Sequence, residues 1–215
     1  MITKENQQHV LQKVNDIIYD CIQESGFDPT VKEPGHSYGE KVEEILAEKL
    51  SKEDLRFSLP PKTKGKGKQT RQMGDLIWEN KNLINIKLGY EKGNGQPNMV
   101  SFNRLLEKFY KDEIDSYYIL IVNVLGKTKD SLTTDICLFN LYDYLDCVHY
   151  DYGTGQVMLK EKQFFSVYDS NKYFDNTKKS IMFKLKEINE IAFHSHIKLK
   201  QNQYQKRQEI FNEYC

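Results

Sequence analysis

Three residues close together in the sequence could bind a hard metal ion and act on a phosphate group. Asp75 opens a short apolar run, and Asn85 and Lys87 follow it after nine intervening residues. Carboxylate and amide oxygens are suitable ligands for Mg²⁺, and an ammonium group stabilises negative charge that develops in a reaction. Together these residue types indicate chemistry in which Mg²⁺ polarises a phosphodiester and lowers the pKa of an attacking water.

The sequence around these residues predicts a β-hairpin. Residues 83–88 alternate between apolar and polar side chains, which places Asn85 and Lys87 on one face of a strand and the apolar residues on the other. The turn-forming residues 79–82 separate this strand from the apolar run before it. A hairpin would therefore bring Asp75 back beside the second strand.

The length of the hairpin loop decides whether the three residues meet. A four-residue loop would place Asp75 opposite Ile86, on the core face of the hairpin. A three-residue loop or a bulge would place Asp75 with Asn85 and Lys87. The sequence leaves these alternatives open.

The pattern of Asp75, Asn85, Ile86 and Lys87 resembles the PD-(D/E)XK nuclease superfamily and, within it, the type II restriction endonucleases. The specific part of the resemblance covers roughly the middle third of the chain. Gly74 stands where the superfamily usually has proline, and Asn85 stands where it usually has a second carboxylate. Asparagine offers one neutral oxygen, which can coordinate a hard cation but adds no negative charge.

The resemblance implies a role for each residue. Asp75 would be the anionic ligand of Mg²⁺, and the Asn85 side chain and the Ile86 carbonyl would be neutral ligands. Lys87 would lie against the scissile phosphate and the attacking water. An early helix in such nucleases often brings a glutamate to the metal. The expected helix 39–50 offers Glu43 for this role, with Glu44 in reserve, although charged residues on an amphipathic helix are usually solvated.

The resemblance also implies a function: Mg²⁺-dependent, sequence-specific cleavage of double-stranded DNA at a short palindromic site by a homodimer. Two other functions stay open. The chain could be a DNA-binding module that has the nuclease fold without catalysis, or a protein-interaction domain. In the latter case the basic segment 62–71 would be only a solvated surface loop.

Two segments and one helix carry side chains suited to DNA contacts. The segment 62–71 contains five cations and no acid, and each cation paired with a phosphate would release counterions. The loop 89–98 is rich in amides, which can pair with adenine, or which simply form turns. The candidate DNA-binding residues are Lys62, Lys64, Lys66, Lys68, Arg71, Lys92, Asn94, Gln96, Asn98 and Arg104.

Hydrophobic patterning predicts an α/β fold with a restriction-endonuclease-like core, in which helices flank a mixed central sheet, and a single domain spanning residues 1–215. The most apolar run, 116–125, predicts a central strand covered on both faces. Helices are expected at 4–24, 39–50, 101–111 and 140–145, and at 180–193 and 197–214 as one long or two short helices; further strands are expected at 135–139, 156–159 and 164–168.

Composition and short sequence patterns indicate which class of protein and which cellular location to expect. The 215 residues carry a net charge of zero, which is not typical of a nonspecific nucleic-acid binder. The four cysteines show no metal-binding spacing, and His194 and His196 are expected to be a surface pair. No targeting segment and no apolar run near the ~20 residues of a membrane span is visible, so we expect a soluble cytoplasmic protein.

Overall fold

The computed structural model describes residues 2–26, 36–61, 73–79, 81–90, 98–125, 131–168 and 177–214. The chain separates into two compact units. The first comprises Met1–Pro97 and Glu107–Tyr142, and the second comprises Asn98–Leu106 and Asp143–Cys215. The single domain expected from the sequence stays a prediction, and each unit is described by itself.

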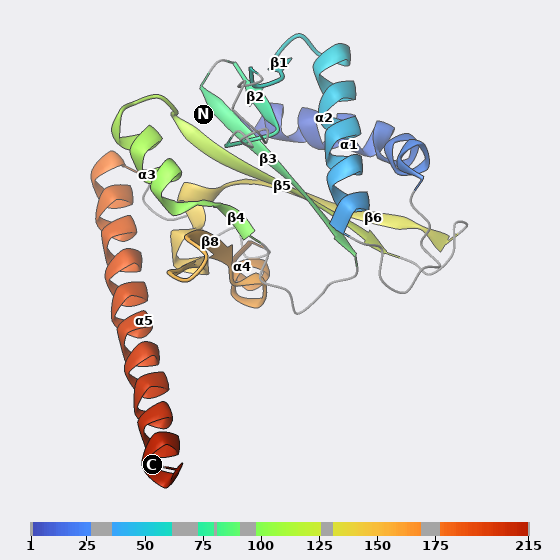
Figure 1. The fold of residues 1–215 in the computed structure, drawn as a ribbon. Coiled ribbons are helices and arrows are strands. Elements are labelled where there is room, and N and C mark those ends of the chain that lie inside the picture. Colours follow the sequence, from blue (N-terminus) through green and yellow to red (C-terminus); the bar gives the residue numbers. More distant parts are fainter. Residues whose placement is uncertain are drawn as a thin grey trace. The chain divides into compact units, whose positions relative to one another are not determined.

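A mixed five-stranded sheet forms the centre of the first unit (Figure 1). Its order is β1-β2-β3-β5-β6, in which β3 and β5 are parallel and the other neighbours are antiparallel. The strands are β1 (Phe57–Ser58), β2 (Leu76–Trp78), β3 (Asn82–Tyr90), β5 (Ser116–Leu125) and β6 (Thr133–Asn140). The predicted α/β class and the central strand 116–125 are therefore confirmed.

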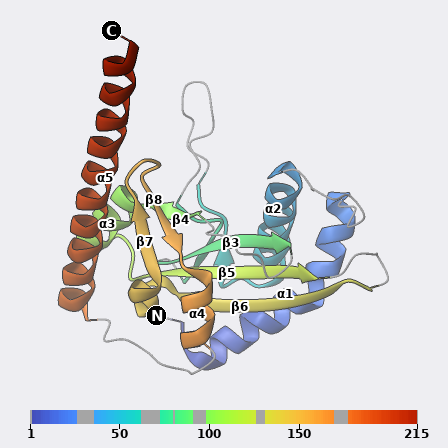
Figure 2. The ribbon, with the colours of Figure 1, turned by 90° about the horizontal axis from the view of Figure 1, so that it is seen from below.

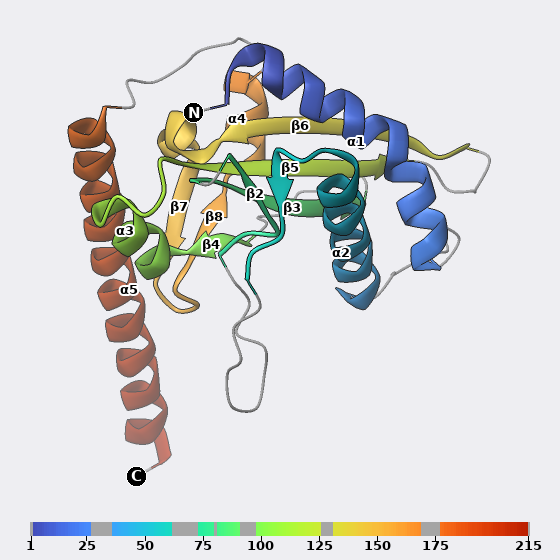
Figure 3. The same cartoon turned by 90° about the horizontal axis from the view of Figure 1, so that it is seen from above.

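Two helices, α1 (Lys4–Ser25) and α2 (His36–Glu53), pack on one face of this sheet (Figure 3). Thr3 caps α1 by accepting a hydrogen bond from the Asn6 amide, and Gly26 ends the helix in the left-handed conformation at φ 75°. The buried side chains of both helices form one core with alternate residues of β3, among them Ile84 and Ile86. Because strand residues alternate, Asn85 and Lys87 project from the opposite face.

The register between β3 and β5 decides which β5 residues share that opposite face. Asn85 pairs with Ile119 and Leu83 pairs with Tyr117. Tyr117 therefore lies on the same face as Asn85, whereas Tyr118 belongs to the core under the helices. Both tyrosine side chains are buried.

The second unit contains a three-stranded antiparallel sheet and a long helix (Figure 2). The sheet has the order β4-β8-β7, and α5 spans 37 residues and packs beside β7. Phe102 stacks on Tyr150 in this unit, with ring centroids 4.5 Å apart. The elements are β4 (Asn98–Ser101), β7 (Val148–Asp151), β8 (Gln156–Leu159), α4 (Glu161–Tyr168) and α5 (Lys178–Tyr214).

Helix α3 (Phe102–Tyr110) and the 3₁₀-helix η2 (Leu141–Cys147) continue from one unit into the other. Both agree with helices predicted from the sequence, and the predicted strand 156–159 is β8. The C-terminal segment is one long helix.

One predicted strand is wrong and three observed strands were not predicted. Residues 164–168 belong to helix α4. Phe164 and Tyr168 lie one helical turn apart and pack against each other and against Tyr144. This packing overrides the preference of aromatic residues for strands. The unpredicted strands are β1, β4 and β7.

The helices of the described ranges do not meet the requirements of a membrane span. None of them is both long enough and apolar enough to cross a bilayer.

Candidate functional site

The register of the β2–β3 hairpin places Asp75 on the same face as Asn85. Trp78 pairs with Asn82 and Leu76 pairs with Ile84, which leaves a three-residue loop. The ladder ends at Leu76, and beyond it the Asp75 amide donates to the Ile84 carbonyl at 2.9 Å, which holds Asp75 beside β3. The three-residue alternative is therefore correct, and the four-residue alternative is wrong.

β2 pairs with one edge of β3 as far as Ile84. Beyond this residue, carboxylate side chains accept hydrogen bonds from the same edge of β3. The Ile86 amide donates to Asp75 Oδ2 at 2.7 Å, and the Leu88 amide donates to Glu43 Oε1 at 3.0 Å. Alternate amides of a strand point to the same side and lie about 6.6 Å apart. The two carboxylates thus follow each other along one edge of β3.

The Ile86 carbonyl lies between these two bonded amides. The N–H and C=O groups of one strand residue point to the same side of the strand. Since the Ile86 amide bonds Asp75, its carbonyl faces the same edge, in the interval before the Leu88 amide. A backbone oxygen is therefore presented between the carboxylates of Asp75 and Glu43.

Glu43 lies in an electrostatic environment shared with the other site residues. Burial raises the pKa of its carboxyl group, and the Lys87 ammonium and the Leu88 amide partly oppose this rise. The negative charge of Asp75 adds to the rise. Glu43, Asp75 and Lys87 are thus close enough to influence one another, and Lys87 is half-buried beside Asn85, which is 8% exposed.

The donor atoms fit Mg²⁺. Two carboxylates, one amide side chain and one backbone carbonyl are hard oxygen donors of the kind this ion binds, and the ion normally keeps several waters. Within the described ranges no three His, Cys, Asp or Glu side chains form a cluster, so the negative charge here comes from Asp75 and Glu43. The reserve candidate Glu44 is exposed on α2.

Most of the candidate DNA-binding residues lie outside the described part of the chain. They are Lys62, Lys64, Lys66, Lys68, Arg71, Lys92, Asn94 and Gln96. The backbone of Asn98 forms the start of β4, where Asn98 pairs with Met158. Arg104 is exposed on α3, in the part of that helix that belongs to the second unit.

The structure adds a residue that the sequence did not identify. Tyr117 is 1% exposed, and its hydroxyl is hydrogen-bonded to the side chain of Asn85. Burial, and then the charge of Asp75, raises the pKa of this hydroxyl well above its usual value. The sequence contains no signal for this contact, because Tyr117 and Tyr118 are adjacent and only the β3–β5 register decides which of them faces Asn85.

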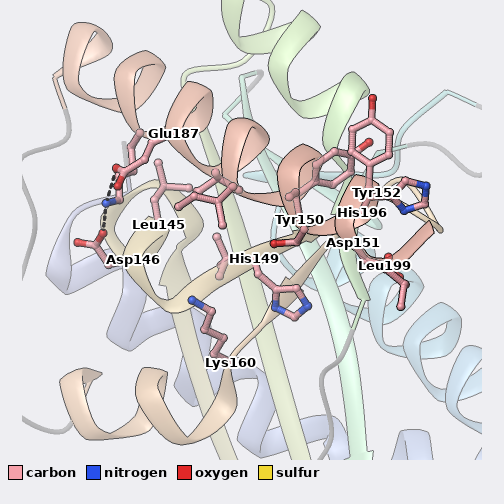
Figure 4. Close-up of a pocket in the computed structure, with 16 residues that line it drawn as sticks. Leu145, Asp146, His149, Tyr150, Asp151, Tyr152, Lys160, Glu187, His196 and Leu199 are labelled. Carbon is pink, nitrogen blue, oxygen red and sulfur yellow. Dashed lines mark hydrogen bonds and ion pairs between the residues drawn. The ribbon is translucent and has the colours of Figure 1, made fainter. Parts of the chain in front are cut away.

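The second unit contains a groove of about 470 Å³ between β7 and α5 (Figure 4). His149 and Lys160 lie on one side of the groove, and Lys184 bridges Asp146 and Glu187 at one end. Burial, and then Lys160, lowers the pKa of His149. None of the residues predicted to bind metal lines this groove.

Of the predicted histidine pair of α5, His194 is exposed and His196 is half-buried. His196 lines the groove and packs against the ring of Tyr152, with centroids 5.2 Å apart.

Comparison with known proteins gives no assignment. No protein-family model matches this chain, and no curated protein matches its sequence.

Proposed function

We propose that the protein is a Mg²⁺-dependent, sequence-specific endonuclease that cuts double-stranded DNA, of the type II restriction kind in the PD-(D/E)XK superfamily. One observation carries the proposal: the carboxylates of Asp75 and Glu43 bond successive amides on one edge of β3, on either side of the Ile86 carbonyl. The strand that holds this edge also carries Asn85 and Lys87.

Each residue has a distinct task in this proposal. Asp75 and Glu43 hold the cation by charge, and the Ile86 carbonyl and the Asn85 side chain complete its protein ligands. Lys87 donates hydrogen bonds to a phosphate oxygen and to the attacking water, and stabilises the negative charge that develops on the phosphate oxygens in the transition state. Bound Mg²⁺ supplies Lewis acidity and lowers the pKa of water.

The position of Glu43 favours a catalytic nuclease over a protein with the nuclease fold that has lost catalysis. Asn85 removes the negative charge that the superfamily usually has at this position. Glu43 places a second carboxylate at the edge of β3, where its oxygen is bonded to the Leu88 amide. The site therefore keeps two carboxylates and one lysine, which is enough charge to attract a divalent cation.

The proposed substrate and assembly follow from the resemblance. Twofold symmetry of a homodimer matches a palindromic site, and one active site then cuts each strand. The basic segment 62–71, which immediately precedes Asp75 in the chain, would contact DNA phosphates.

The first test is cleavage of a sequenced plasmid by the purified protein with Mg²⁺, with discrete fragments as the expected product. Lys87→Ala should lower the cleavage rate about 10²–10³-fold, because it removes a charge that stabilises the transition state. Asp75→Asn should do the same, because it keeps an acceptor for the Ile86 amide but removes the negative charge.

Lys81→Ala is the matched control, since Lys81 is an exposed lysine at the hairpin turn. Its cleavage rate should equal that of the wild type, and circular dichroism should show that all variants are folded. Full cleavage by folded Lys87→Ala protein would refute the proposed function.

Asn85 stands where the superfamily usually has a carboxylate. This difference motivates one alternative, a DNA-binding module without catalysis. Such a module would retard DNA on a gel and leave it intact with Mg²⁺ present. Negligible DNA affinity at low salt would instead indicate a protein-interaction domain.

A further inference from the structure

The second half of α5 extends beyond the part of the helix that packs on its own unit. Ile188 and Ala192 are buried, whereas every residue from 197 to 207 is exposed among the described residues. Figure 1 and Figure 2 both show the red end of α5 continuing past β7 and β8. A helix without tertiary contacts gains little stability in water, which favours a partner that binds this end.

This exposed part of α5 is basic. Residues 191–208 contain no acid and four cations, namely Lys198, Lys200, Lys206 and Arg207. None of the four forms an ion pair with a residue of the described ranges. In the first half of the same helix, Lys184 and Lys186 are both paired with carboxylates. Since the whole chain has no net charge, the segment is a local concentration of positive charge that fits a polyanion.

Three of the cations lie on two opposite sides of the helix. Successive residues of an α-helix are about 100° apart around its axis. Lys198 therefore lies roughly opposite Lys200 and Arg207. The face between these two sides continues the buried face of α5 and carries three further polar side chains: Asn202, Gln203 and Lys206.

This arrangement matches the major groove of duplex DNA. The groove is about 12 Å wide and admits an α-helix, whose diameter with side chains is about 10–12 Å. Phosphates border the groove on both sides, as the cations do on α5. Asparagine and glutamine amides can pair with adenine, and a lysine ammonium can donate to guanine.

We propose that residues 197–207 of α5 are a recognition helix that enters the major groove of DNA. Lys198 binds phosphates on one side of the groove, and Lys200 and Arg207 bind phosphates on the other. Asn202, Gln203 and Lys206 contact the bases between them. This inference rests on the proposed function, which makes duplex DNA the partner, and it names the residues that set the choice of sequence.

The phosphate contacts are tested by the salt dependence of DNA binding. Fluorescence anisotropy measures binding to a labelled duplex without Mg²⁺, so the DNA stays intact. Each phosphate contact adds about 0.9 to the slope of log affinity against log salt. Replacing Lys198, Lys200 and Arg207 together by alanine should therefore lower this slope by about 2–3 on any duplex. Alanine favours helix, and circular dichroism should show that α5 is kept.

A triple variant of Lys52, Lys111 and Lys186 to alanine is the matched control. These three lysines are also exposed on helices, but each is paired with a glutamate one turn away. The control removes the same number of charges and should change the slope by less than about one. Equal slopes for the two triple variants would mean that only net charge matters, and they would overturn the inference.

The base contacts are tested with duplexes that the wild type selects from a random pool. Asn202→Ala and Gln203→Ala should each lower the preference for selected over random duplexes about 5- to 150-fold, the range for a bidentate contact to a base. The salt slope on random duplexes should stay that of the wild type. Gln201→Ala is the control, because Gln201 is an exposed amide on the other side of the helix. An unchanged preference in both Asn202→Ala and Gln203→Ala would overturn the assignment of base contacts.

The remaining outcomes separate this inference from the proposed function. If the triple variant of Lys198, Lys200 and Arg207 binds DNA like the wild type while the wild type cuts plasmid, the inference alone is wrong. If α5 binds an anionic membrane, the same variant would lose binding to phosphatidylserine vesicles and keep its DNA affinity, which would also overturn the inference. A wild type that binds no duplex at low salt would refute the proposed function itself.

Discussion

Glu43 and Asp54 are both hydrogen-bonded carboxylates, but their pKa values move in opposite directions. Burial raises the pKa of Glu43 despite the nearby Lys87. The Arg56 guanidinium holds the pKa of Asp54 far below its ordinary value, with further hydrogen bonds from the Arg56 amide and His9. Asp54 therefore stabilises the folded chain at neutral pH, whereas the buried charge of Glu43 carries a cost that is typical of functional sites.

Replacing Asp54 by asparagine should lower the free energy of unfolding by about 1.5–3 kcal/mol at pH 7, the contribution of hydrogen bonds to a charged group. Because its pKa is lower in the folded chain than in the unfolded chain, Asp54 stabilises fully above its ordinary pKa of 3.8. This stabilisation disappears as the pH falls through the folded value. Urea unfolding at pH 7 and at successively more acidic pH should show the wild type approaching Asp54→Asn.

Asp20→Asn removes a carboxylate that is exposed on α1 and serves as the control. It should change the free energy of unfolding by less than about 0.5 kcal/mol at pH 7. The free energy of unfolding of Asp54→Asn could instead differ from that of the wild type by the same amount at every pH. That result would mean that the charge of Asp54 does not stabilise the fold.

At the same scale, the resemblance to nucleases singled out Asp75, Asn85, Lys87 and Glu43, and the structure brings the carboxylates of Asp75 and Glu43 to one edge of β3. The sequence could not select Tyr117, because contact between Tyr117 and Asn85 depends on how β3 and β5 align. These strands are separated in the chain by β4 and α3, so their parallel register is not fixed by a short turn. The alignment could not be read from residues 116–125 themselves.

At the scale of elements, the long strands with a clear pattern were predicted, whereas three of the short strands were not. The alternation in 83–88 and the apolar run 116–125 correctly indicated β3 and β5. The unpredicted strands β1, β4 and β7 have two to four residues each, too few for a period to be recognised. Short strands depend on their partners, as β4 does on β8.

Position 89 of β3 leaves little room for a side chain. Gly89 lies opposite Asn123, and a Cβ atom at Gly89 would collide with Asn123 Oδ1. Asn123 is 8% exposed, so it has little room to move. Gly89→Ala should therefore lower the free energy of unfolding by about 1–3 kcal/mol, the usual cost of overpacking, as measured by urea denaturation.

Gly153→Ala is the matched control for Gly89. Gly153 lies in the turn between β7 and β8, and the nearest atom that an added Cβ would meet is Asp151 Oδ1 at 3.3 Å. This substitution should cost less than about 0.5 kcal/mol. Equal stability of Gly89→Ala and the wild type would show that Asn123 moves freely.

At the scale of the whole molecule, each unit has buried side chains of its own. Leu120 is part of the core between the first sheet and helices α1 and α2, and Leu185 is 1% exposed on α5 in the second unit. The sequence predicted one domain because no long linker separates the units. The chain passes from one unit to the other between residues 97 and 98, inside α3 and inside η2.

Hydrogen exchange should reveal whether the two units unfold separately. Leu120→Ala and Leu185→Ala should each destabilise the surroundings of the substituted residue by about 2–5 kcal/mol. If each unit is a cooperative group, Leu120→Ala accelerates amide exchange in β3, β5 and β6, and Leu185→Ala accelerates it in β7, β8 and α5. Acceleration of both sets of amides by both variants would show instead that residues 1–215 unfold as one domain. Because Asp75, Asn85 and Glu43 all belong to the first unit, separate unfolding would allow Leu185→Ala protein to retain the proposed Mg²⁺ binding at temperatures where its second unit has already unfolded.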